Sequence, residues 1–62
     1  MLSFGERLKT LRRESGFSQS YIAEQIGVSI QSVSNWECDN TMPDISQIVP
    51  LASFLGVSTD CL

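Results

Sequence analysis

The sequence contains no histidine, only two cysteines, and four basic residues against seven acidic ones. Histidine is the commonest general base and a frequent zinc ligand, so its absence removes most acid–base and mixed zinc chemistry. Cys38 and Cys61 are too few for a structural zinc site. We expect both to be reduced thiols, with a single disulfide as the alternative.

Other features of enzymes and membrane proteins are also missing. There is no glycine-rich phosphate loop, and no serine or cysteine has an identifiable activating partner. No apolar run approaches the roughly 18 residues of a membrane span, and residues 1–6 do not resemble a signal peptide. We therefore expect no enzyme, no metal or other cofactor and no membrane segment, and we favour a cytoplasmic location.

What remains is a short chain rich in helical patterns. Its 62 residues, 42% of them hydrophobic, predict one globular domain over residues 1–62. Strict alternation of apolar and polar residues is absent, which argues against strands. The sequence predicts an all-α domain.

Serine caps and glycine stops divide the chain into expected helices. Ser3 with Glu6 resembles a capping box, and an apolar stripe follows until Gly16 ends the first helix. Ser18 and Ser29 are expected to cap the next two helices. The third should end near Glu37, with Trp36 either in the core or acting as an exposed aromatic reader.

A fourth helix is expected to begin at Asp44, whose pairing with Gln47 resembles a second capping box, and to end before Gly56. Pro50 should kink this helix or delay its regular start. The inward positions are expected to be Ile45, Ile48, Leu51, Ala52 and Leu55. A last turn should begin at Ser58 and be cut off at Leu62, which suggests a domain from a longer protein.

The segment 18–37 is the most informative. It predicts two short helices separated by a tight turn at Gly27, where glycine adopts a positive φ without strain. The second of these helices buries one side and presents Ile30, Gln31, Ser34 and Asn35 on the other. Two short helices with outward amides and hydroxyls are typical of a helix-turn-helix that reads a DNA major groove.

Several motifs in register resemble the Cro and phage-repressor (XRE-like) type of helix-turn-helix domain. They are Arg7-Leu8-Lys9-x-Leu11-Arg12, Gly16-Phe17-Ser18-Gln19, Ile22-Ala23, Ile26-Gly27-Val28-Ser29, Val33-Ser34-x-Trp36-Glu37, Pro43-Asp44 and Leu51-Ala52-x-Phe54-x-Gly56-Val57-Ser58-x-Asp60. This resemblance implies a compact five-helix bundle of the lambda-repressor-like type. It also implies a homodimer that binds double-stranded operator DNA to regulate transcription, with no small-molecule effector evident.

The resemblance also assigns residues to roles. Base contacts are implied for Ile30, Gln31, Ser34 and Asn35, although Ile30 could instead pack on the preceding helix. Phosphate contacts are expected for Gln19, Ser29, Ser32 and Arg13, with capping as the alternative for the two serines. Arg12 and Glu37 match a partly buried structural ion pair, which would leave Arg7, Lys9 and Arg13 as bases for DNA.

Charge argues partly against this interpretation. The net charge is −3, whereas a protein that binds phosphates usually has a positive net charge. The loop after the third helix holds Asp39 where the family usually has glycine, and contains no base. These departures favour a second hypothesis, a protein-interaction or antitoxin-like module on the same fold.

Overall fold

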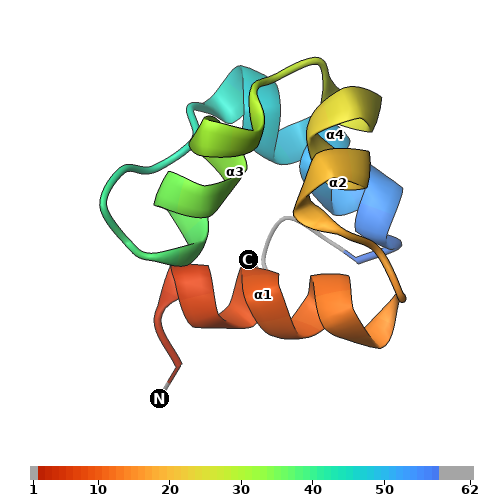
Figure 1. Cartoon of the computed structure of the whole chain (residues 1–62), viewed down its shortest axis with the longest axis horizontal. Helices are drawn as coiled ribbons and strands as arrows, with labels where there is room; N and C mark the ends of the chain where they lie inside the picture. Colours follow the sequence, from red (N-terminus) through yellow and green to blue (C-terminus); the bar gives the residue numbers. More distant parts are fainter. Residues whose placement is uncertain (1, 58–62) are drawn as a thin grey trace.

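Four α-helices joined by short turns make up residues 2–57, the part of the chain that the computed structural model describes (Figure 1). They are α1 (Phe4–Glu14), α2 (Gln19–Ile26), α3 (Ile30–Glu37) and α4 (Ile45–Leu55). The expected count of five helices is therefore wrong. The count came from the family resemblance, and the only stretch left for a fifth helix was the turn expected from Ser58, which lies outside the described residues. A single turn is too short to specify a helix by itself.

Three of the helices begin at a serine whose hydroxyl accepts a hydrogen bond from the amide three residues later. Ser3 caps α1 at 3.2 Å, Ser18 caps α2 at 3.0 Å and Ser29 caps α3 at 3.1 Å. Each bond satisfies one of the amides that a helix start leaves without an intrahelical partner. The starts expected from the serine positions are confirmed.

The turn between α2 and α3 depends on Gly27. Its φ of 81° lies in the left-handed region, which a residue with a Cβ adopts only at a cost. The Gly27 and Val28 amides both donate to the Ala23 carbonyl, at 2.9 and 3.0 Å. The chain thus reverses within a few residues and places α3 directly after α2.

Each helix contributes one fully buried aliphatic side chain to a shared core. These are Leu8, Ile22, Val33 and Leu51, all 0% exposed. Burying such side chains contributes about 1.5–3 kcal/mol each. Trp36 is 3% exposed and joins the same cluster, so it is a core residue and not an exposed reader. Figure 1 shows α1 lying across one side of the other three helices.

The fourth helix differs from expectation at Ile45. This residue is expected to point inward but is 72% exposed, because it occupies the first turn, where the other described helices do not cover it. Pro50 lies inside α4. Of its two expected effects, a delayed start is not seen, because the helix begins at Ile45, directly after its expected cap. None of the helices in residues 2–57 is long and apolar enough to cross a bilayer.

Candidate nucleic-acid interface

The outward side of α3 carries amide and hydroxyl groups and no charge. Ile30 is 51% exposed and Gln31 is exposed, while Ser34 and Asn35 are half-buried. The exposure of Ile30 argues against the alternative in which it packs on α2. The only charged residue of α3, Glu37, is 4% exposed and faces the interior.

Gln31 and Asn35 are linked to each other. The Gln31 Nε2 donates to Asn35 Oδ1 at 3.1 Å, as residues four apart on one helix face can. Gln31 retains its Oε1 acceptor and a second amide hydrogen, and Asn35 retains its amide hydrogens. This surface can therefore both donate and accept, which is what recognition of adenine N6 and N7 requires.

The start of α3 is organised by two serines. The Ser29 hydroxyl accepts from the Ser32 amide at 3.1 Å, and the two hydroxyl oxygens lie 3.0 Å apart. Capping, the alternative to a phosphate contact, is therefore present at Ser29, whereas Ser32 supplies the amide that is capped. The amides of the first turn and the helix dipole make such a start favourable for an anion.

Gln19, at the start of α2, is held by the end of α3. Its Nε2 donates to Glu37 Oε1 at 3.0 Å, and the residue is half-buried. In this arrangement the Gln19 side chain links the two helices of the helix-turn-helix. Its side-chain donor is thus engaged within the protein, a contact that its position in the sequence did not indicate.

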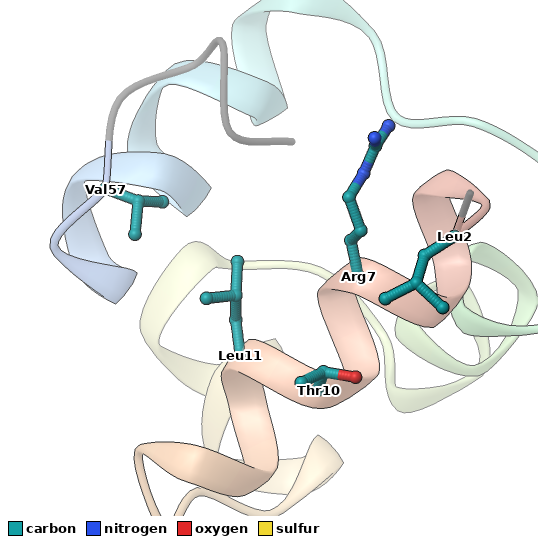
Figure 2. A pocket seen from close by; sticks show the side chains of 5 residues that line it. All are labelled: Leu2, Arg7, Thr10, Leu11 and Val57. Carbon is teal, nitrogen blue, oxygen red and sulfur yellow. The ribbon is translucent and has the colours of Figure 1, made fainter.

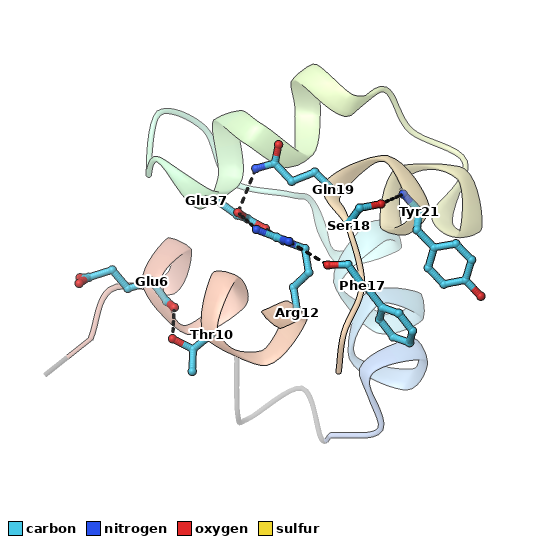
Figure 3. A network of polar contacts seen from close by, with 8 residues as sticks. All are labelled: Glu6, Thr10, Arg12, Phe17, Ser18, Gln19, Tyr21 and Glu37. Carbon is cyan, nitrogen blue, oxygen red and sulfur yellow. Dashed lines mark hydrogen bonds and ion pairs between the residues drawn. The ribbon is translucent and has the colours of Figure 1, made fainter. Parts of the chain in front are cut away.

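The ion pair expected between Arg12 and Glu37 is present (Figure 3). Arg12 donates to both carboxylate oxygens, through Nε at 2.6 Å and Nη2 at 3.2 Å. Its Nη1 donates to the Phe17 carbonyl at 2.8 Å. The side chains are 12% and 1% exposed, so the pair is largely desolvated and joins α1, the turn before α2, and α3.

A close backbone approach fixes α1 against α3. A Cβ added at Gly5 would lie 2.5 Å from the Glu37 carbonyl oxygen and 2.6 Å from that of Trp36. No side chain fits at these distances. The glycine therefore sets how near the start of α1 comes to the end of α3.

Asp39 holds the same junction from the loop side. Its carboxylate accepts from the Ser3 hydroxyl at 2.7 Å and from the Gly5 amide at 2.9 Å. These bonds, the Ser3 one foremost, lower the pKa of Asp39 below its ordinary value of 3.8. Its φ of 60° is positive, which Asp tolerates better than most residues. The acidic residue that counted against DNA binding thus caps a helix.

The sequence did not indicate that Gly5, Asp39 and the Gln19 contact help to hold α3 in place. Gly5 looked like any residue in a first turn, and Asp39 lies 36 positions from Ser3. One signal for the role of Asp39 was available. It occupies a position where the family favours glycine, which indicates that the backbone there has a positive φ.

The basic residues lie together on α1. Arg13 is exposed and Lys9 is half-buried. Arg7 borders a small pocket of about 190 Å³, lined also by Leu2, Thr10, Leu11 and Val57 (Figure 2). Sites for small molecules usually measure about 300–1,000 Å³, so we assign this pocket no ligand.

The helix-turn-helix family matches residues 8–60, and the chain belongs to that family. It is 41% identical over 59 residues to YonR, an SPbeta prophage-derived HTH-type transcriptional regulator of Bacillus subtilis (strain 168), covering 95% of this chain and 55% of YonR. It is 36% identical over 61 residues to the HTH-type transcriptional regulator ImmR of the same organism, covering 98% and 48%. The chain thus spans about half the length of these curated relatives.

Two solved structures of DNA complexes share the fold. The P22 c2 repressor with a synthetic operator aligns with a TM-score of 0.92 at 28% identity, covering 97% of this chain and 91% of that one. The biofilm regulator SinR of Bacillus subtilis, in complex with DNA, aligns with a TM-score of 0.85 at 34% identity, covering 94% of each chain.

Proposed function

We propose that this chain is a sequence-specific DNA-binding domain of a transcriptional regulator, with α3 in the major groove. One observation carries the proposal: α3 presents an uncharged amide surface, and its only carboxylate, Glu37, is buried and paired with Arg12. An exposed acid at this place would repel DNA. The relatives are HTH-type transcriptional regulators, and two structural neighbours are complexes with DNA.

Base recognition is assigned to the four outward residues of α3. Gln31 and Asn35 supply donors and acceptors suited to adenine, and Ile30 offers an apolar contact for a thymine methyl. Ser34 lies on the same half-exposed side and supplies a hydroxyl. The bond between Gln31 and Asn35 restricts both side chains before DNA arrives, which lowers the entropy lost on binding.

Phosphate contacts are assigned mainly to backbone amides. The starts of α2 and α3 each offer first-turn amides with a favourable dipole, at Gln19 and around the Ser29–Ser32 pair. Arg13, exposed on α1, is the base best placed to reach a phosphate. Binding through amides releases few counterions, so each protomer should bind with low salt sensitivity.

The domain acts as a homodimer at paired half-sites in the cytoplasm and has no enzymatic role. A symmetric pair would place two α3 helices about one helical turn apart on the duplex. Two weak contacts on one duplex reinforce each other through effective concentration. This compensates for the few bases that a single protomer offers.

A random duplex library tests this function. The chain is incubated with the library at low and at moderate salt, and the retained duplexes are sequenced. We expect enrichment of one short motif, repeated with dyad symmetry, at both salt concentrations. Retention of duplexes without any shared motif, or no retention at low salt, would contradict it. The second outcome would favour the protein-interaction alternative, which the absence of bases in residues 38–42 supports.

A further inference from the structure

Gln31 and Asn35 differ in how firmly the fold holds them. Gln31 is exposed, whereas Asn35 is half-buried on the same side of α3. The Asn35 carbonyl accepts from the Asn40 amide at 2.9 Å and from the Thr41 amide at 3.4 Å. The next residue, Trp36, is 3% exposed in the core. Asn35 is therefore the fixed member of the pair, and Gln31, with its longer side chain, is the outer member.

The hydrogen bond between the two side chains uses one particular end of each amide. Gln31 Nε2 donates to Asn35 Oδ1 at 3.1 Å. Gln31 is left with Oε1 as an acceptor and one N–H as a donor. Asn35 is left with its two N–H donors, because its oxygen is turned toward Gln31. Only Gln31 can therefore place an oxygen and an N–H side by side against one base edge.

The orientation of a glutamine amide decides which purine it can read. In the major groove adenine offers a donor at N6 and an acceptor at N7, whereas guanine offers acceptors at O6 and N7. An amide that is free to turn over exchanges its oxygen and nitrogen ends, and so can present a donor where guanine needs one. The bond to Asn35 opposes this turn, because a Gln31 amide rotated by itself would bring its oxygen against Asn35 Oδ1.

We propose that Gln31 selects adenine over guanine, and that Asn35 is a positioning residue that fixes which end of the Gln31 amide faces the base. Gln31 accepts from adenine N6 through Oε1 and donates to N7 through its remaining N–H. Asn35 keeps its own donors for a neighbouring base, where donors alone do not separate the purines because both present N7. α3 contains no Arg or Lys, the side chains that commonly read guanine.

The inference deepens the proposed function by naming the base and the residue that selects it, and it rests on that function. The bond between the two amides forms in the free protein and does not require DNA. Base selection and the pairing of the amides are therefore tested by separate measurements.

Asn35→Ala and Asn35→Asp separate positioning from direct contact. Asn35→Ala removes the acceptor, and alanine suits a helix interior, so the variant should fold, which circular dichroism checks. Asn35→Asp keeps an oxygen that can accept from Gln31 Nε2 and removes both N–H donors. Fluorescence anisotropy measures binding to duplexes with adenine, guanine or 7-deazaadenine at the position where Gln31→Ala loses preference. The matched control is Gln25→Ala, which removes an exposed amide from α2.

The wild type and the control should prefer adenine over guanine at this position by about tenfold or more. They should bind 7-deazaadenine, which lacks the N7 acceptor, at least about twofold more weakly than adenine. For Asn35→Ala we expect the preference for adenine to fall below about threefold. Asn35→Asp should bind every duplex more weakly, because its charge repels phosphate, yet keep the wild-type ratio of adenine to guanine.

Three results would overturn the inference. The first is a wild type that binds guanine as well as adenine, because both amides would then turn over together. The second is a wild-type ratio in Asn35→Ala, and the third is a lost ratio in Asn35→Asp.

Side-chain amide NMR of the free protein tests the pairing without DNA. The Gln31 Nε2 hydrogen accepted by Asn35 should resonate downfield in the wild type and in Asn35→Asp, and should move upfield in Asn35→Ala. A Gln31 amide unchanged in Asn35→Ala would refute the inference and leave the proposed function standing. Paired amides in a protein that enriches no motif from the duplex library would instead refute the proposed function, and the base assignment with it.

Discussion

Glu37, the last residue of α3, accepts hydrogen bonds from Arg12 at both carboxylate oxygens while remaining 4% exposed. A single buried carboxylate thus links α1 to the helix that we assign to the major groove. The same oxygen that accepts from Arg12 Nη2 also accepts from Gln19. The orientation of the recognition surface therefore depends on one charge cluster in the interior.

Removing one partner of this pair should be costly. We expect Arg12→Met to destabilise the domain by about 3–5 kcal/mol, because the Glu37 carboxylate would remain buried without its counter-charge. A chain of this length is stable by about 3–9 kcal/mol, so the variant should lose a large fraction of its stability and should unfold if the wild type lies at the lower end of this range. Urea unfolding followed by circular dichroism measures the difference.

Gln19→Ala is the matched control for this cluster. It removes one neutral donor from the charged Glu37 carboxylate and should cost about 1.5–3 kcal/mol. An Arg12→Met variant as stable as Gln19→Ala would show that the ion pair does not hold the helices together.

Gly5→Ala tests the close approach of α1 to α3. The new Cβ would lie 2.5 Å from the Glu37 carbonyl oxygen, a backbone atom that cannot rotate away. We expect a net loss of about 1–3 kcal/mol, although alanine is by itself the better helix former. Thr10→Ala, at an exposed position of the same helix, should stay within about 0.5 kcal/mol. Equal midpoints of thermal unfolding for the two variants would contradict the close approach of α1 to α3 at Gly5.

Asp39 should make stability depend on acid pH. Its pKa is lowered in the folded state by the bonds from Ser3 and Gly5. A lowered pKa stabilises the fold above the ordinary value of 3.8, and that contribution is lost as the pH falls through the lower, folded value. We expect the urea midpoint of the wild type to fall in this range, and more steeply than that of Asp39→Asn. Ser3→Ala should show an intermediate slope, and parallel profiles for all three proteins would argue against the cap.

Salt dependence tests how phosphates are held. Besides the paired Arg12, the chain carries only Arg7, Lys9 and Arg13 as bases. Even if all three contacted phosphates, the slope of log K against log salt would be no steeper than about −3 per protomer. Arg13→Ala should lower affinity equally for all duplexes and reduce the slope by about one. A much steeper slope for the wild type would mean that phosphate is bound elsewhere than proposed.

Local signals were sufficient for much of the fold. The serine caps and the turn at Gly27 follow from residues within a few positions of each other, so their chemistry can be read from the chain directly. The Arg12–Glu37 pair was expected from the family resemblance, because its partners lie 25 positions apart and no local pattern links them.

The supporting contacts around Asp39 could not be predicted in this way. The bond from Ser3 depends on how α1 packs on α3, and the sequence around a loop carboxylate is the same whether that carboxylate is solvated or hydrogen-bonded.

At Ile45 the local pattern was clear, but the prediction from it was wrong. Its spacing from Ile48 suits the core side, but a first-turn residue extends past the helices that would cover it. Helical periodicity describes a face and does not say how far the neighbouring helix extends.

The α3 surface is tested most directly with single-base variants of the selected duplex. Fluorescence anisotropy compares the wild type with Gln31→Ala and Asn35→Ala across the whole panel. We expect each variant to lose about 1–3 kcal/mol of discrimination at one or two positions only. Losses in the double variant should be less than additive, because the two amides are hydrogen-bonded to each other. Unchanged preference at every position in both variants would show that α3 does not read the DNA.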